Sequence, residues 1–542
     1  MLRSIEGHAG DVALAALIPF GVDVMFTLNG GHVWPLYDAA TKHGLKVVDT
    51  RHEQTATWAA EAYAKLTRRP GLAVLTAGPG VTNGVSAMTS AHFNGSPLVV
   101  VGGRAPQGRW GSGSLQELDH VPIVASITKR ATTITSGADV ASVMQELARA
   151  ASTPHRGPVF VDLPIDVFFG PSNGDVDDAP EVSPGATPDP DEVAAAALLM
   201  ARAARPALIA GSDVYWAGAW EQLRAAIEAL RVPCFANGMG RGCLPLGHEL
   251  GFSRTRGLLR QEADVVVVVG TPLDFRLGYG SFGSARVVHI VDSDEGRAAH
   301  VPSAVSVAGD LGAILGGLAE WSGDREDHDP WIKSLRVAED AGREREGPLL
   351  EADGDPIKPT RVFGELARRL DPDGVVVCDG GDFASYAGKY LDPGRPGCWL
   401  DTGPYGCLGN GPGYAMAARL ARPDSQVVAI LGDGAAGFSL MDVDSMVRHD
   451  LPAVMVVGNN GIWGLEKHPM KAMYGYDVAC DLQPETRYDS VVAALGGAGE
   501  TVRAGRDIGP ALDRAFASGV PYLVNVITDP SDVYPRSGPL GF

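Results

Sequence analysis

The stretch Val427-Val428-Ala429-Ile430-Leu431-Gly432-Asp433-Gly434 joins an unbroken apolar run to a glycine turn that carries a single acid. An apolar run without alternating polar residues predicts a strand that is buried on both faces of a parallel sheet. A second run, Ala453 to Val457, leads into Gly458-Asn459-Asn460-Gly461-Ile462. The separation of Asp433 from Asn460 leaves room for one helix and that second strand. We therefore expect both polar side chains at the carboxyl ends of adjacent strands, where α/β sheets bind ligands.

Similar apolar runs recur through the chain and alternate with segments of helical pattern. They include Leu72 to Thr76, Leu98 to Val101, Ala207 to Ala210, Val265 to Val269, Val287 to Val291, Val375 to Val377 and Tyr522 to Val526. This alternation predicts an α/β fold with three doubly wound parallel-sheet domains. Two segments rich in Pro, Gly and charged residues, 170–192 and 344–359, are interpreted as linkers. The expected domains are residues 1–170, 190–322 and 358–530.

The composition is that of a globular protein with an acidic surface. The 542 residues include 45 basic and 65 acidic ones, which gives a formal net charge of -20. This charge argues against general binding to nucleic acid or to anionic membranes. No two of the six cysteines form a C-x-x-C pair, and no apolar run is long enough to span a bilayer. Because the first residues lack a signal-peptide core, we expect a cytoplasmic protein that acts on a small molecule.

The residue types at the two strand ends suit a hard divalent cation. Such a cation prefers oxygen ligands and keeps coordination positions open for phosphate. The Asp433 carboxylate, the Asn460 amide oxygen and the Ile462 backbone carbonyl supply three oxygens. The small residues Gly434 and Ala435 let backbone N–H groups approach a phosphate. Each motif alone is more simply a tight turn or a strand-end cap, but together they indicate a diphosphate held through a metal ion.

This segment resembles the cofactor-binding signature of thiamine-diphosphate enzymes, a group that includes acetolactate synthases, 2-hydroxyacyl-CoA lyases and oxalyl-CoA decarboxylases. The resemblance covers nearly the whole chain and implies thiamine diphosphate and Mg²⁺ as cofactors. It also implies that the three domains are, in order, a pyrimidine-binding, a central and a diphosphate-binding domain. On the third domain the residues that match cofactor contacts are Asp382, Phe383, Gly406, Leu408, Gly432, Asp433, Gly434, Ala435, Asn460, Ile462 and Trp463.

The first domain carries the motifs that match the family's pyrimidine side. In Arg51-His52-Glu53-Gln54, the resemblance makes Glu53 the carboxylate that faces the aminopyrimidine and activates the cofactor by sharing a proton. An isolated glutamate there would instead be interpreted as a solvated residue at a helix start. The other matching residues are Gly78, Pro79 and Asn83 beside the pyrimidine and Gln116 at the reacting centre.

A loop on the third domain resembles the one that bends the cofactor in this family. It runs from Asp401 to Gly411 and is rich in glycine. By resemblance, the Gly406 carbonyl would accept from the exocyclic amine, and Leu408 would be the apolar wedge between the two rings. The simpler interpretation, a glycine-rich turn that leads into a helix from residue 413 to residue 420, is compatible with this role.

Members of the family differ in their reaction, and three alternatives are open here. Leu400-Asp401 and Gly461-Ile462-Trp463 look like the CoA-dependent lyases, so the leading hypothesis is a 2-hydroxyacyl-CoA lyase-like enzyme that forms an aldehyde or ketone plus formyl-CoA. His32 matches a histidine of benzaldehyde lyase that could shuttle protons, or it simply caps a strand end. The second alternative is an acetolactate synthase-type carboligase, which decarboxylates and condenses 2-keto acids. The third is a non-catalytic protein with the cofactor fold.

Two further expectations concern the central domain and the assembly. Asp292 ends a predicted strand, where an acid can bond a ribose hydroxyl, and Arg156 and Arg256 could meet phosphates. The alternatives for this region are ADP or CoA, FAD, or no ligand at all. Because Glu53 and Asp433 lie on different domains, and because family members hold each cofactor between two chains, we expect a homo-oligomer, either a dimer or a tetramer.

Overall fold

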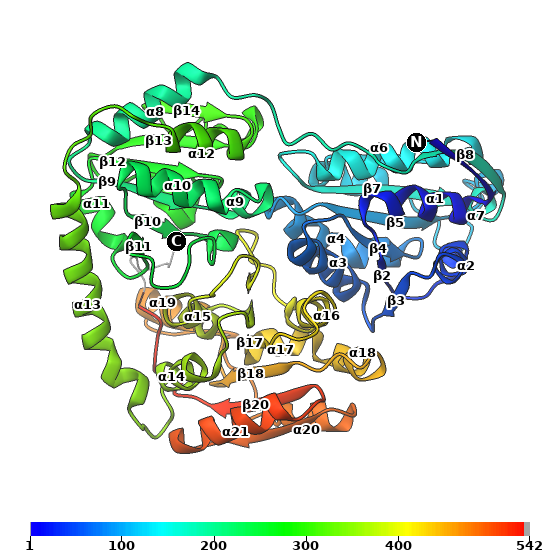
Figure 1. The fold of residues 1–542 in the computed structure, drawn as a ribbon. Helices are drawn as coiled ribbons and strands as arrows, with labels where there is room; N and C mark the ends of the chain where they lie inside the picture. Colours follow the sequence, from blue (N-terminus) through cyan, green and yellow to red (C-terminus); the bar gives the residue numbers. More distant parts are fainter. Residues whose placement is uncertain (1, 536–542) are drawn as a thin grey trace.

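The computed structural model describes residues 2–535 and folds them into three six-stranded parallel sheets flanked by helices (Figure 1). The sheets follow one another along the chain, so each third of the sequence builds its own sheet. The predicted α/β class with three parallel-sheet domains is therefore confirmed.

The first sheet has the strand order β3-β2-β4-β5-β7-β6. Alternate residues of its central strand β4 face different cores: Leu72 and Val74 pack with helices α1 and α6, whereas Ala73 and Leu75 pack with helices α3 and α4. This two-sided burial explains why the strand is apolar throughout. The elements are α1 Ala9–Leu17, β2 Val24–Thr27, α2 Trp34–His43, β3 Lys46–Asp49, α3 Glu53–Thr67, β4 Gly71–Leu75, α4 Pro79–Phe93, β5 Leu98–Arg104, β6 Arg130–Thr133, α6 Val140–Ser152 and β7 Pro158–Pro164.

The central sheet has the order β11-β10-β9-β12-β13-β14. Its strand β12 consists of five fully buried valines, whose branched side chains suit a strand covered on both faces. The elements are α8 Pro190–Arg202, β9 Pro206–Ala210, α9 Ser212–Ala217, α10 Trp220–Leu230, β10 Cys234–Ala236, β11 Gly251–Phe252, β12 Val265–Val269, β13 Arg286–Val291, β14 Val305–Ala308 and α12 Leu311–Ala319.

The third sheet has the order β16-β15-β17-β18-β20-β19. Gly432 of β17 is in register with Gly458 of β18, so the residues after both strands emerge side by side at one edge. The elements are α14 Pro359–Arg369, β15 Val375–Asp379, α15 Asp382–Tyr390, β16 Trp399–Leu400, α16 Gly411–Ala421, β17 Val427–Gly432, α17 Asp433–Ser439, α18 Val443–Arg448, β18 Val454–Asn459, α19 Gly464–Tyr474, α20 Tyr488–Ala494, β19 Ala498–Val502, α21 Gly505–Ala517 and β20 Tyr522–Ile527.

The two segments interpreted as linkers are more ordered than expected. Strand β8 (Pro171–Asp177) pairs antiparallel with β1 (Leu2–His8), so the first part of segment 170–192 belongs to a small sheet. Helix α13 (Asp329–Glu351) extends into the second segment. It is anchored by buried Glu339, whose carboxylate accepts N–H bonds from the backbone of residues 253–255. These long-range hydrogen bonds keep both segments ordered although their local composition is typical of linkers.

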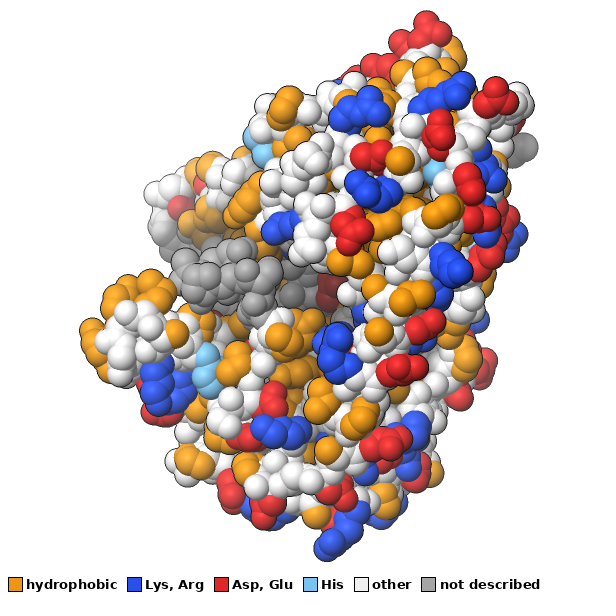
Figure 2. All heavy atoms as spheres, turned by 90° about the vertical axis from the view of Figure 1, so that its left-hand side faces the viewer, with side chains coloured by type: hydrophobic (Ala, Val, Ile, Leu, Met, Phe, Trp, Pro, Cys, Tyr) orange, Lys and Arg blue, Asp and Glu red, His pale blue; other side chains and the backbone are white. Residues whose placement is uncertain are grey.

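Figure 2 shows the face that carries α13, where positive and negative side chains alternate over the surface. This mixed pattern agrees with a solvated helix that holds the central and third sheets together along its inner side. In the described part of the chain, no helix combines the length and the apolar character that crossing a bilayer requires.

The first and third domains of one chain pack together through α3 and α16. At this contact Glu61 and Lys65 are buried and form an ion pair at 3.0 Å. The Tyr414 hydroxyl lies 2.8 Å from a Glu61 oxygen and 2.9 Å from the Lys65 nitrogen. Since buried charges are tolerated when they are paired and hydrogen-bonded, this triad fixes how the two domains meet.

Candidate active site

The cofactor-matching residues of the third domain lie around one cavity at the carboxyl edge of its sheet. Strands β15, β17 and β18 are neighbours, and the segments that follow them form the cavity wall. The lining residues that the sequence singled out are Asp382, Phe383, Gly406, Leu408, Gly432, Asp433, Gly434, Ala435, Asn460, Ile462 and Trp463.

Asp433 is the buried acid of this cavity. One carboxylate oxygen accepts from the Gly461 N–H at 2.6 Å and the other from the Gly434 N–H at 2.9 Å. Burial raises the pKa of Asp433 to about 6, although these N–H bonds act in the opposite direction. Within residues 2–535, no lysine, arginine or histidine forms an ion pair with this carboxylate. A divalent cation in the cavity would supply the missing positive charge.

Asn460 stands beside Asp433, while the preceding asparagine points elsewhere. The Asn460 amide oxygen accepts from the Ile462 N–H at 3.2 Å and lines the cavity. Asn459 instead donates to the Thr486 carbonyl and to the Asn525 amide oxygen, away from the cavity. Of the asparagine pair, only Asn460 can therefore offer an oxygen to a cation in this cavity.

Glycines allow aromatic rings to form the cavity walls. A Cβ atom on Gly434 would lie 2.4 Å from the Trp463 ring, and one on Gly458 would lie 2.2 Å from the Phe383 ring. A ligand in the cavity can therefore contact the backbone of Gly434 and Gly458 and the edges of the Trp463 and Phe383 rings directly. A buried carboxylate without a basic partner, an adjacent amide oxygen and exposed backbone together fit a diphosphate held through a divalent cation.

Other lining residues were missed by sequence reasoning. Gly380 and Gly381 follow β15 directly, so a glycine pair after an apolar run was the available signal. Asp379 lies behind them, fully buried, and accepts from the Gly409 and Gly411 N–H groups at 3.0 and 2.8 Å. It shapes the glycine-rich loop before α16. The remaining missed residues are Thr402, Gly458, Gly464, Leu465 and Glu466.

Glu53 is the first residue of α3, and its side chain is nearly buried. Its carboxylate accepts from the Asn83 amide N–H at 3.0 Å. The His52 ring accepts from the Gln54 N–H at 3.1 Å and so caps the helix start. The two first-domain residues Glu53 and Asn83 are therefore in direct contact.

His32, Gly78 and Gln116 form a second group on the first domain. The His32 ring lies 3.3 Å from the Thr76 hydroxyl, and burial lowers the pKa of this histidine. A Cβ atom on Gly78 would lie 2.9 Å from the Gln116 Cβ, so these residues are in contact. Gly78 has φ +60°, which favours glycine, and Pro79 opens helix α4 directly after it. Sequence reasoning missed His120, which accepts from the Gly78 N–H.

The two halves of the predicted site do not share one cavity within a single chain. Every residue that lines the third-domain cavity belongs to the segment from residue 380 to residue 466. Glu53 is not among them, although its neighbour Gln54 lies 3.4 Å from the Leu408 carbonyl oxygen.

The three residues proposed for a nucleotide are distributed over two places. Asp292 lines a cavity at the ends of β9, β12 and β13, together with His155 and Asp213. Arg156 is half-buried near those acids, whose charges partly offset the effect of burial in lowering its pKa. Arg256 lines a different cavity, between β10, β11 and α13. Arg256 and Asp292 therefore do not form one binding site.

Comparison with known proteins agrees with this architecture. The chain matches three family models: the thiamine pyrophosphate enzyme N-terminal TPP binding domain over residues 8–123, the central domain over 193–318 and the C-terminal TPP binding domain over 379–526. The three matched segments fall on the three sheets. The chain therefore belongs to the thiamine pyrophosphate enzyme family, and it is a thiamine-diphosphate-dependent enzyme.

Relatives within the family carry two different names. The chain is 50% identical over 533 residues to the acetolactate synthase large subunit IlvG of Mycobacterium tuberculosis, covering 98% of this chain and 97% of that protein. It is 34% identical over 544 residues to 2-hydroxyacyl-CoA lyase 2 of Homo sapiens, covering 91% of this chain and 84% of the lyase.

Proposed function

We propose that the chain is an acetolactate synthase-type carboligase that decarboxylates one 2-keto acid and joins the remaining fragment to a second. The observation that carries this proposal is the 50% identity to an acetolactate synthase large subunit over almost the full length of both chains. The lyase reading favoured by the local motifs is supported by the weaker 34% similarity. Similarity thus favours the second of the sequence alternatives over the first.

In this proposal the third-domain cavity holds the cofactor's diphosphate. Asp433, the Asn460 amide oxygen and the Ile462 carbonyl would bind Mg²⁺, and the glycine walls would contact phosphate. When bound, thiamine diphosphate supplies a nucleophilic carbon and an electron sink for decarboxylation.

The chain's own residues would hold and move protons around that cofactor. Asn83 donates to one Glu53 oxygen, which leaves the other oxygen to hold the proton shared with the pyrimidine. His32 and Gln116 would contact the substrate from the first domain. Burial keeps His32 neutral at physiological pH, so it could accept a proton from a hydroxyl group.

The test is incubation with pyruvate, thiamine diphosphate and Mg²⁺, with acetolactate and CO₂ measured. We expect acetolactate from the wild-type enzyme and a loss of about 100-fold or more in Glu53→Gln, because proton transfer by a positioned group is worth that much. Glu61→Gln is the matched control: it lies on the same helix and should lower stability but leave the chemistry of folded protein largely intact. Cofactor binding without a 2-hydroxy-3-keto acid product from any pair of 2-keto acids would reject the proposal.

A second candidate, the 2-hydroxyacyl-CoA lyase, is favoured by the cavity that contains Arg256. Burial lowers the pKa of Arg256 to about 10, and the nearby charges of Arg241 and Arg276 act in the same direction. Arg241 lies over the Trp399 ring and Arg336 over the Phe252 ring. In the part of the chain that is described, Arg241, Arg256 and Arg336 form no ion pair with a carboxylate. A phosphate-bearing ligand would satisfy these arginines.

This candidate makes its own measurable prediction. Cleavage of a 2-hydroxyacyl-CoA to formyl-CoA should occur, and Arg256→Gln should raise the KM for the CoA ester about tenfold or more. Arg260→Gln is the control, because Arg260 is nearby but does not line the cavity. Asp292→Asn tests whether the other central cavity affects the same KM. Absence of formyl-CoA would reject the lyase.

We also propose a homo-oligomer, either a dimer or a tetramer. No first-domain residue lines the third-domain cavity of one chain, which supports a second chain that brings its Glu53 to a cofactor there. Large apolar side chains near both half-sites are exposed and suit burial between chains; they are Trp34, Leu115, Phe438 and Met441. Sedimentation of the active enzyme should show no monomer, and a dilute monomer with full activity would contradict the proposal.

A further inference from the structure

We propose that His120 is a positioning residue that holds the Gly78 turn and, through it, Gln116 and His32 at the reacting side of the first domain. The proposal rests on the proposed cofactor role of that side. His120 does not line the third-domain cavity, and no sequence motif pointed to it.

The hydrogen bonds of His120 define which nitrogen carries its proton. The Gly78 N–H donates to His120 Nε2 at 2.9 Å. A backbone N–H can only donate, so Nε2 must be an unprotonated acceptor. The proton therefore sits on Nδ1, which lies 2.8 Å from the Asp162 carboxylate. Both His120 and Asp162 are fully buried.

The surroundings of Asp162 hold its carboxylate in place beside His120 Nδ1. The Thr133 hydroxyl donates to one Asp162 oxygen at 2.6 Å, and the Arg104 guanidinium donates to the other at 3.0 Å. Arg104 also pairs with Asp119 at 3.0 Å, and the bonds to Asp162 fix the carboxylate that orients the imidazole through Nδ1. Asp162 on β7 and Arg104 on β5 thus hold His120 in place from two neighbouring strands.

The Gly78 turn needs this support because its backbone conformation is unusual. Gly78 has φ +60° and ψ -113°, and it is buried. Without His120 the buried Gly78 N–H would lack a hydrogen-bond partner, which is unfavourable.

The Gly78 turn also positions the two candidate substrate contacts, Gln116 and His32. Gln116 packs against Gly78 and has φ +58°, a value that is rare for a residue with a side chain. The backbone of Leu115, next to Gln116, lies close enough to His32 to affect the pKa of its ring. A shift of the Gly78 turn would therefore displace Gln116 and the backbone beside His32 together.

The test compares His120→Gln with His120→Leu. Glutamine keeps an acceptor for the Gly78 N–H and a donor for Asp162, whereas leucine fills similar space with neither. The measurements are the Kd for thiamine diphosphate with Mg²⁺, the rate of exchange of the cofactor's thiazolium C2 proton in D₂O, and the Tm of the cofactor-free protein. His289→Leu, a buried histidine of the central sheet, is the control.

We expect His120→Leu to slow C2 exchange about tenfold or more, since small displacements near a reacting centre have large effects on rate. His120→Gln should recover most of that rate, and His289→Leu should lower Tm alone. Two results would overturn the proposal. One is C2 exchange at the wild-type rate in His120→Leu. The other is an equal loss of exchange rate in His120→Leu and His120→Gln while the Tm of both stays unchanged. Exchange without acetolactate formation would reject the carboligase only, whereas no exchange in the wild-type protein would overturn both.

Discussion

Single glycines decide how closely the walls of the third-domain cavity approach. Gly434 begins the segment after Asp433, and the Trp463 ring occupies the space where its side chain would be. Gly437 is three residues further along α17 and has no atom within 4 Å of its would-be Cβ. These two positions therefore differ in packing while sharing one helix.

We expect Gly434→Ala to weaken thiamine diphosphate binding about tenfold or more, because the new methyl group must displace the Trp463 ring and overpacking costs about 1–3 kcal/mol. Gly437→Ala should leave the Kd unchanged. Titration calorimetry with Mg²⁺ checks both variants. Equal affinity in Gly434→Ala and wild type would mean that the ring does not border the bound cofactor.

At the scale of residues, the sequence predicted polar groups that directly follow strands. Asp433 and Asn460 could be placed together because parallel strands end at one edge of a sheet. His120 and Asp162 could not, since their pairing depends on how a loop folds back over β7. Arg256 and Asp292 were joined in one hypothesis because both lie near strand ends, but the strand order of the central sheet places β10 and β11 on one side of β9 and β12 and β13 on the other, so the two cavities are separate.

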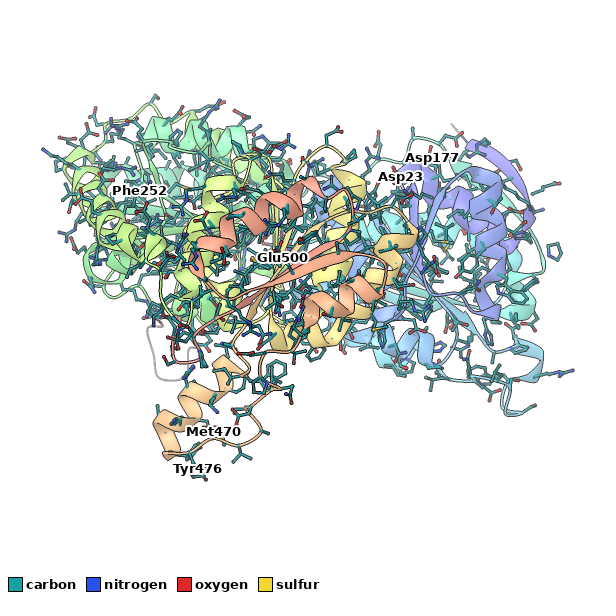
Figure 3. All side chains as sticks on the ribbon, turned by 90° about the horizontal axis from the view of Figure 1, so that it is seen from below. Asp23, Asp177, Phe252, Met470, Tyr476 and Glu500 are labelled. Atoms are coloured by element: carbon teal, nitrogen blue, oxygen red, sulfur yellow. The ribbon has the colours of Figure 1, made fainter. Side chains whose placement is uncertain are left out.

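Helix α19 contacts the cavity through its first residues, and the rest of the helix packs loosely. None of its residues is buried, and Figure 3 shows its Met470, with Tyr476 of the following loop, on a segment that projects from the body. Lys467 ties this helix to the following loop through Asp477 at 2.9 Å and Asp481 at 2.6 Å. These ion pairs stabilise the projecting segment locally.

Lys467→Met should therefore open this segment without unfolding the molecule. We expect cleavage between residues 464 and 482 by a broad-specificity protease to become several-fold faster, while the Tm of the whole protein stays the same. Lys471→Met, on the same helix, is the control. A fall in Tm with no change in local cleavage would show that Lys467 supports the body of the protein instead.

At the scale of elements, buried strands were the most predictable feature. Val265–Val269 matches its predicted bounds, because five consecutive valines suit only a strand buried on both faces. Strand β8 was missed because its pairing with β1 lies far away in sequence. Helix α13 was missed because its charged, Pro-containing end is stabilised by distant backbone groups rather than by its own composition.

The whole molecule is held together partly by a charged contact between the first and central domains. His155, just before β7, lies 3.2 Å from an Asp292 oxygen and 3.8 Å from an Asp213 oxygen. Burial lowers the pKa of His155, but the two carboxylates outweigh this effect and raise it to about 9. The imidazole is therefore protonated at neutral pH, while burial and the neighbouring Asp292 charge raise the pKa of Asp213 to about 7.

This contact should make stability depend on pH in a defined direction. A histidine with a raised pKa adds stability that is complete below its unfolded value of about 6.5 and is lost as pH rises through about 9. The Tm of wild type should thus exceed that of His155→Gln at pH 6.5, and the difference should shrink by pH 10. The exposed His43→Gln serves as control. A difference that grows with pH would contradict this assignment.

The central claim is that the third-domain cavity binds thiamine diphosphate through a divalent cation held by Asp433. The direct measurement is calorimetric titration of thiamine diphosphate into metal-free protein, with and without Mg²⁺, for wild type and Asp433→Asn. We expect tight binding only for wild type with Mg²⁺, and an affinity at least about 100-fold lower in Asp433→Asn, because removing one partner of a buried charge pair is strongly destabilising. Equal affinity with and without Mg²⁺, or in the variant, would contradict the claim.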